Sequence, residues 1–194
     1  MPYRLAIFDM DGTLTEELLD FAAIRSDLGL SEKCPILEAI ATLPTHLQPD
    51  AHAILHRHEM SAAESCRLHD GAADLLSALH HRGIFTALLT RNSRHCAHRI
   101  LERHKLVLDH IATRDDAPHK PHPDSILNIA RKFAVPASQT LMIGDYLYDL
   151  QAAHAAGVDS ALLCPADPDR LPPFAPMATY RIHHLRELLP ILAS

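Results

Sequence analysis

The stretch FDMDGTLTEE, residues 8–17, places two aspartates two positions apart directly after the apolar run Leu-Ala-Ile-Phe. That run has the length and composition of a buried strand. Asp9 and Asp11 therefore fall where the strand ends, and Gly12 with Thr13 forms the turn that leads away from it. Carboxylates this close repel one another unless a proton or a cation compensates them, so the strand end is expected to hold such a group.

From residue 84 onward, short β-rich runs alternate with helical patterns. Alternation of this kind is typical of an α/β fold in which helices cover both faces of a Rossmann-like parallel sheet. The pattern predicts strands at 4–8, 84–89, 110–113, 140–143 and 160–163, and helices at 94–104, 123–134 and 147–157. A proline-rich loop at 165–176 then precedes a short strand and a helix at 185–192.

The segment between the first two strands is longer than a parallel crossover needs. Helices are predicted at 18–28, 35–43, about 49–68 and 72–82, and the last of these alone suffices to connect two parallel strands. We therefore interpret residues 17–69 as an inserted helical cap. Residues 1–16 and 70–194 are then the Rossmann-like core.

Composition narrows the possible partners. The chain has 194 residues and a formal net charge of −6, so it has no general attraction for nucleic acid or an anionic membrane. Its apolar runs fall well below the roughly 18 residues of a membrane helix, and its start lacks the features of a secretory signal, so we expect a cytoplasmic protein.

Four cysteines without a CxxC pair favour neither a zinc knuckle nor a disulfide framework. Among the sixteen histidines, His52, His56 and His58 are interpreted as a solvated face of the cap, and the pairs at 80–81 and 183–184 are assigned no function.

Polar side chains follow three of the expected strands. Asp9, Thr90 and Asp145 each come directly after a strand, and Asp149 lies one turn into the next helix. Because ligands of open parallel sheets bind at the carboxyl ends of the strands, we expect these side chains and Lys120 to share one crevice. Oxygen ligands without histidine or cysteine favour Mg²⁺, with Asp9, Asp11, Asp145 and Asp149 as candidates.

A crevice neutralised by Mg²⁺ and Lys120 can accept a phosphate. One carboxylate could then attack phosphorus and form an aspartyl phosphate, which divides a difficult hydrolysis into two easier steps. The neighbouring Asp11 could protonate the leaving oxygen and afterwards deprotonate the attacking water. The expected substrate is a small phosphorylated metabolite.

Four motifs carry a family resemblance: FDMDGT, LLTRN, KPHPD and GDYLYD, in this order from Phe8 to Asp149. They resemble the motifs of the haloacid dehalogenase-like (HAD) hydrolases, in particular the phosphoglycolate phosphatase-like branch with a helical cap after the first strand. The resemblance implies that Asp9 is the nucleophile, Asp11 the general acid and base, and Thr90 a donor to the phosphoryl oxygens. It further implies that Lys120 neutralises charge. The implied Mg²⁺ ligands are Asp9, Asp145 and the backbone carbonyl of Asp11, with Asp149 in or near the second ligand layer.

Asp11 separates the activities within the family. The dehalogenase members attack carbon without Mg²⁺ and lack this aspartate, so phosphoryl transfer is strongly preferred. A phosphomutase stays open as an alternative. A receiver-type phospho-acceptor domain is less favoured, because it has no inserted cap.

Two further features of the sequence concern the substrate. Many HAD relatives have asparagine directly after the second-motif threonine, whereas this chain has Arg91 before Asn92. The candidate substrate contacts are Gly12, Thr13, Arg91 and Asn92. The cap is short, and we hypothesise that it admits a bulkier substrate or leaves the site more open. The oligomeric state stays open.

Overall fold

The computed structural model describes residues 2–16 and 19–193. At its centre is a six-stranded sheet in the order β3-β2-β1-β4-β5-β6, and every neighbouring pair is parallel. The strands are β1 (Leu5–Phe8), β2 (Phe85–Leu89), β3 (His110–Ala112), β4 (Thr140–Gly144), β5 (Asp159–Leu163) and β6 (Tyr180–Ile182). The order reverses between β1 and β4, which places the predicted crevice at the centre of the sheet.

The helices agree closely with the sequence pattern. They are α1 (Phe21–Asp27), α2 (Ile36–Thr42), α3 (Gln48–Ser65), α4 (Ala72–His81), α5 (Arg94–His104), α6 (Asp124–Lys132), α7 (Leu147–Ala156) and α8 (Leu188–Ala193). Ser93 caps α5 as expected, since its side chain accepts the backbone N–H of Cys96. The helix predicted from Leu18 begins outside the described residues. The proline-rich loop contains two short 3-10 turns, Pro168–Arg170 and Ala175–Met177.

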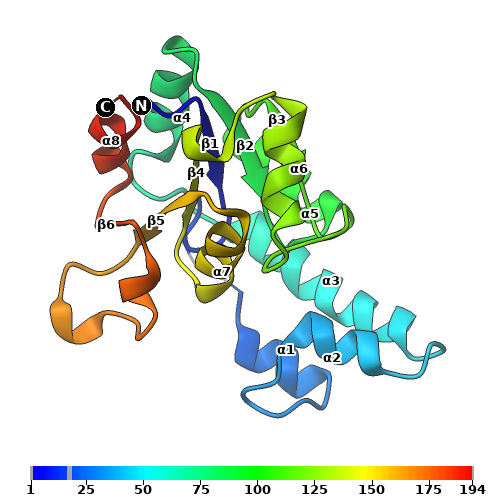
Figure 1. Ribbon diagram of the computed structural model, residues 1–194. Helices are drawn as coiled ribbons and strands as arrows, with labels where there is room; N and C mark the ends of the chain where they lie inside the picture. The colour runs from blue at the N-terminus through cyan, green and yellow to red at the C-terminus, as the bar shows by residue number, and fades with distance from the viewer. Residues whose placement is uncertain (1, 17–18, 194) are drawn as a thin grey trace.

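The central strand β1 is buried on both faces, which is typical of a parallel sheet. Leu5 and Ile7 join the apolar cluster formed with α6 and α7, whereas Ala6 and Phe8 face the cluster formed with α4, α5 and α8. Successive side chains of a strand point to opposite faces, so four consecutive apolar residues supply both layers. Figure 1 shows the helices on both sides of the sheet and the two chain ends close together.

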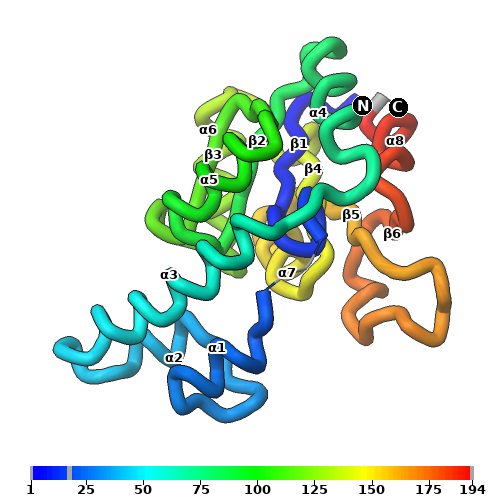
Figure 2. The backbone as a smooth tube through the Cα atoms, turned by 180° about the vertical axis from the view of Figure 1, so that it is seen from behind, coloured from blue at the N-terminus to red at the C-terminus, as the bar shows by residue number. Residues whose placement is uncertain are grey.

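Helices α1 and α2 and the first part of α3 project from the sheet (Figures 1 and 2). They have an apolar cluster of their own, which includes Ile24, Ile40 and Leu55. The later part of α3 packs on α5, and its Ala63 belongs to the cluster beneath the sheet. Helix α3 therefore contributes to both clusters. This arrangement supports an inserted cap, while the boundaries at residues 17 and 69 stay predictions, and Glu17 lies outside the described residues.

Two adjacent segments, residues 14–16 and 67–69, connect the core to the projecting helices. The backbone N–H of Glu16 donates to the carbonyl of Arg67 at 3.0 Å, and that of His69 donates to the carbonyl of Leu14 at 3.0 Å. These bonds hold the outgoing and returning segments side by side. Within the described part of the chain, no helix has both the length and the apolar character that crossing a membrane requires.

Candidate active site

Three carboxylates meet at the carboxyl ends of the central strands. Asp9 follows β1, Asp145 follows the adjacent β4, and Asp149 lies in the first turn of α7. One ligand atom from each of the three lies within 4.8 Å of the others. The three carboxylates therefore converge as the sequence predicts. Asp149 is a member of this cluster and does not lie in a second layer around it.

Two glycines make room for this group. Gly12 has a positive φ of 75°, and a Cβ there would collide with the carboxylate of Asp145. A Cβ at Gly144 would likewise collide with Asp149. The hydroxyl of Thr13 donates to Oδ1 of Asp145 at 3.0 Å. The structure thus places Gly12 and Thr13 beside Asp145, and their expected contact with the substrate stays a prediction.

Lys120 is the buried counter-ion of the three clustered carboxylates. Its Nζ lies 2.8 Å from Oδ1 of Asp9 and 2.6 Å from Oδ1 of Asp149, and the residue is 1% exposed. Burial disfavours the ammonium form, but the charges of Asp149 and Asp9 outweigh it and raise the pKa of Lys120. The lysine therefore stays charged. The backbone N–H of Met10 also donates to Oδ1 of Asp9 at 2.7 Å, which fixes that carboxylate further.

Asp11 lies apart from the three carboxylates and is held by the second motif. Asn92 donates through Nδ2 to Oδ2 of Asp11 at 2.7 Å, and the Asn92 backbone N–H donates to Oγ1 of Thr90 at 3.1 Å. Burial raises the pKa of Asp11 to about 7, and the charge of Asp9 adds to the rise. A carboxyl group with this pKa can both give and take a proton near neutral pH.

Together, the carboxylates of Asp9, Asp145 and Asp149 carry more negative charge than Lys120 compensates. Burial, followed by the charges of Asp9 and Asp149, raises the pKa of Asp145. Burial also raises the pKa of Asp149, with the charge of Asp9 adding to the rise and Lys120 opposing it. Hard oxygen donors with excess negative charge fit a divalent cation such as Mg²⁺. The residues present therefore suit the expected metal.

A cavity of about 260 Å³ joins this centre to the cap. At its inner end lie Asp9, Asp11, Thr90, Asn92, Lys120, Asp145 and Asp149. Its outer part is lined by the cap residues Leu19, Phe21, Arg25, Pro35, Ile36, Leu37, Glu38, Leu55 and Glu59, and by Arg91, Arg114, Tyr146 and Tyr148 of the core. The cavity thus has a strongly polar floor and a largely apolar cap wall.

Comparison with known proteins identifies the family. The model of haloacid dehalogenase-like hydrolases matches residues 6–163. The chain belongs to this family. The match covers all four motifs, and it decides against the receiver-type alternative.

Individual relatives agree with this assignment. The hydrolase is 32% identical over 167 residues to an uncharacterized hydrolase of Saccharomyces cerevisiae, which covers 82% of this chain and 77% of the relative. It is 28% identical over 214 aligned positions to a phosphoglycolate phosphatase of Pseudomonas fluorescens, covering 96% and 79% of the two chains. A crystal structure of a hydrolase from Pseudomonas syringae superposes with a TM-score of 0.81 at 21% identity, with all of both chains covered, which shows the shared fold.

A buried ion pair connects the cap to the core of the hydrolase, and sequence reasoning missed it. Glu59 on α3 is 1% exposed and pairs with Arg114, which follows β3. The hydroxyl of Ser93 donates to the other oxygen of Glu59 at 2.9 Å. Glu59 lies four residues after Leu55, on the buried face of α3. An acid at such a position is a signal that could have revealed the pair.

Arg91 forms a second connection between core and cap. Its Nη2 lies 2.6 Å from Oε1 of Glu38 on α2, and its guanidinium lies 4.6 Å from the ring centroid of Tyr148 on α7. Tyr148 contacts Tyr146, which in turn contacts Phe174, so the outer core wall is aromatic. The structure thus brings Arg91 to the cavity, as expected, but pairs it with a cap residue that the sequence did not indicate.

Proposed function

We propose that this hydrolase is a Mg²⁺-dependent phosphatase that acts on a small phosphorylated metabolite by way of a phosphoryl group on Asp9. The observation that carries the proposal is the fixed pair of Asp9 and Asp11 at the floor of one cavity. Lys120 holds Asp9 in place, and Asn92 holds Asp11. Asp9 thus pairs with a cation, and Asp11 can exchange a proton near neutral pH.

In the first step, a carboxylate oxygen of Asp9 attacks phosphorus, and the bond from phosphorus to the leaving oxygen breaks. Asp11 gives its proton to that oxygen, which departs as an alcohol. Thr90 Oγ1 already accepts the backbone N–H of Asn92, which leaves its own O–H free to donate to a phosphoryl oxygen. Bound Mg²⁺ would neutralise the phosphoryl oxygens and the carboxylates of Asp9, Asp145 and Asp149.

In the second step, water attacks phosphorus and the bond between phosphorus and Asp9 breaks. Asp11, now ionised, takes the proton of the water, so that phosphate leaves and both carboxyl groups return to their starting forms. Lys120 keeps the charge of Asp9 compensated before and after the transfer. We assign Gly12 and Thr13 the role of positioning Asp145, in addition to the substrate contact expected from the sequence.

Similarity to a phosphoglycolate phosphatase supports phosphate esters as the substrate class. The test is hydrolysis of a panel of phosphorylated metabolites by the purified protein, with Mg²⁺ and with EDTA. We expect phosphate release that EDTA and Asp9→Asn both abolish, while the exposed control Asp74→Asn keeps full activity. Full activity of Asp9→Asn, or in EDTA, would contradict the proposal. Phosphate returned to a sugar instead of to water would identify a phosphomutase.

A further inference from the structure

The outer half of the cavity contains a cation that the proposed chemistry does not use. We propose that Arg91 binds a second anionic group of the substrate, a carboxylate or a second phosphate, carried on the part that leaves with the alcohol. This inference rests on the proposed phosphatase function and adds to it the class of substrate. It makes Arg91 a residue that determines specificity.

The position of Arg91 is the first argument. It lies between Thr90 and Asn92, which belong to the phosphoryl end of the site, and it lines the same cavity. A group bound by Arg91 would therefore lie on the same molecule as the phosphoryl group but farther out, toward the cap. The guanidinium lies over the ring of Tyr148, 4.6 Å from its centroid, and this contact restrains it.

The hydrogen bonds of Arg91 are the second argument. Nη2 pairs with Glu38, whereas Nη1 is buried and has no acceptor among the described residues. A buried donor without an acceptor is costly, and native proteins seldom leave one in that state. A planar guanidinium suits the two oxygens of a carboxylate or phosphate. The open donor on Arg91 therefore points to an anionic ligand.

The distribution of charge is the third argument. At the inner end Lys120 is engaged by Asp9 and Asp149, and in the outer part Arg114 is engaged by Glu59. In the outer part, Arg25 donates to the backbone carbonyls of Phe21 and Cys34. Because Glu59 and Arg114 neutralise each other, Arg25 and Arg91 face one further carboxylate, that of Glu38, among the described residues lining this part. The outer half has a positive balance and attracts a second negative group.

The apolar lining of the cavity indicates the chemistry of the substrate body that connects the two anionic groups. The lining of the same cavity includes Phe21, Ile36, Leu55 and Tyr146. Apolar and aromatic side chains favour a hydrocarbon or ring-bearing body over a chain of hydroxyl groups. The substrate class is therefore a phosphate monoester with an apolar or aromatic body and a second anionic group.

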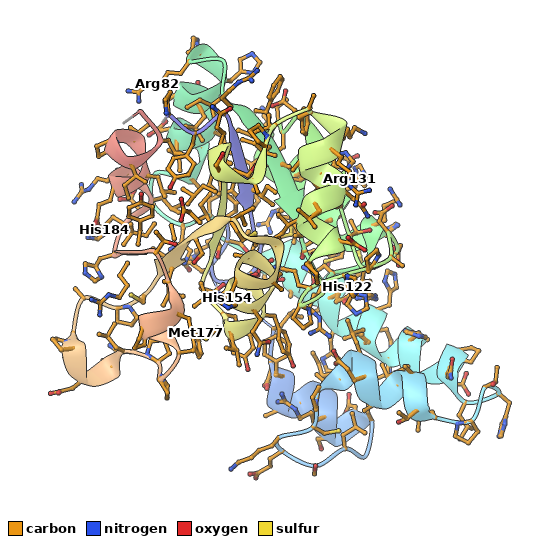
Figure 3. The ribbon with its side chains drawn as sticks, in the orientation of Figure 1. Arg82, His122, Arg131, His154, Met177 and His184 are labelled. Carbon is orange, nitrogen blue, oxygen red and sulfur yellow. The ribbon has the colours of Figure 1, made fainter. Side chains whose placement is uncertain are left out.

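The experiment compares phenyl phosphate, 4-carboxyphenyl phosphate and hydroquinone bisphosphate. We expect the wild-type protein to prefer one of the doubly anionic esters, and the preferred one identifies the second group. In Arg91→Gln, kcat/KM for that ester relative to phenyl phosphate should fall about tenfold to a hundredfold, mainly through KM. The control Arg131→Gln removes an exposed arginine on α6, away from the cap (Figure 3), and should leave the ratio unchanged.

Glu38→Gln separates substrate binding from a purely structural connection. If Arg91 binds substrate, removing the competing carboxylate should maintain or raise the ratio. If Arg91 only holds the cap through Glu38, both variants should lower activity on all esters alike, and that result would overturn the inference. Equal use of the three esters by the wild type would also overturn it.

A binding measurement keeps this inference distinct from the proposed function. Calorimetry with phenylphosphonate and 4-carboxyphenylphosphonate, and with the matching bisphosphonate, needs no turnover. A preference for a doubly anionic ligand that Arg91→Gln removes, without hydrolysis of any ester, would support the inference and contradict the phosphatase. Hydrolysis without any such preference would do the reverse.

Discussion

Nζ of Lys120 lies 2.8 Å from Oδ1 of Asp9, and the two residues come from segments far apart in the chain. The loop before α6 carries the lysine, and the end of β1 carries the aspartate. A nearly fully buried ammonium is stable here because it also contacts Asp149 at 2.6 Å. The lysine therefore serves both the stability of the site and the proposed chemistry.

Replacing Lys120 with methionine should affect both properties. We expect kcat to fall about a hundredfold to a thousandfold, because the group that compensates Asp9 is lost. Without metal, the free energy of unfolding should fall by about 3–5 kcal/mol, since buried carboxylates lose their partner. Steady-state kinetics and urea denaturation measure the two effects. The exposed Lys132→Met is the control, and a kcat within about threefold of wild type would contradict the assigned role.

Asp11→Asn tests proton transfer. The variant keeps an acceptor for Asn92 but cannot donate a proton to the leaving oxygen. We expect kcat to fall about a hundredfold to ten-thousandfold for an alkyl phosphate. The loss should be much smaller for 4-nitrophenyl phosphate, because its leaving group needs little protonation. An equal loss for both esters would contradict the general-acid role.

The stability of the protein should depend on Mg²⁺ and pH together. The folded pKa of Asp11 is raised to about 7 by burial and by Asp9, and that of Asp145 is also raised. Acids with raised folded pKa values stabilise the fold below their ordinary pKa and lose that contribution as pH rises through the folded pKa. Between about pH 4 and 7 the metal-free protein should therefore lose part of its stability.

Mg²⁺ should restore this loss, so the increase in Tm on adding Mg²⁺ should grow from pH 5 to pH 8. Thermal unfolding at several pH values with Mg²⁺ or EDTA measures it. Asp145→Asn removes one of the repelling charges and should be more stable than wild type in EDTA at pH 8. An increase in Tm that is the same at every pH would contradict the link to these carboxylates.

The two ion pairs between cap and core should differ strongly in energy. Glu59 and Arg114 are buried, with side chains 2% and 11% exposed, whereas Glu38 is 47% exposed. Glu59→Gln should lower the free energy of unfolding by about 3–5 kcal/mol. Glu38→Gln should lower it by less than about 1 kcal/mol. Urea denaturation of both variants makes the comparison, and equal losses would show that burial does not determine the contribution.

The fold was predictable from the sequence because local signals agreed with tertiary packing. The alternation of short β-rich runs with helical patterns indicated a parallel sheet, and the apolar run that ends at Phe8 is indeed buried on both faces. Ser93 marked the start of α5 by its capping hydroxyl. The sequence could not show that α3 packs into two different apolar clusters. Its helical pattern continues without a break, although Leu55 belongs to the cluster of α1 and α2 and Ala63 to the cluster of the core.

The site was predictable at its floor and much less so at its outer wall. Carboxylates at the ends of adjacent strands must meet, so topology alone brings Asp9 and Asp145 together. The partners of Arg91 depend on how α2 is placed over the sheet, and no local pattern specifies that placement. The role of Gly12 is similar, since its closeness to Asp145 appears only once β1 and β4 are paired.

The most direct test of the account is detection of phosphate on Asp9. Asp11→Asn is mixed with 4-nitrophenyl phosphate and Mg²⁺, quenched rapidly in acid, digested and analysed by mass spectrometry. Because the second step lacks its base, we expect the peptide containing Asp9 to gain the mass of one phosphoryl group, and Asp9→Asn to show no such gain. Release of 4-nitrophenol that needs neither a phosphorylated peptide nor the Asp9 carboxylate would contradict the account.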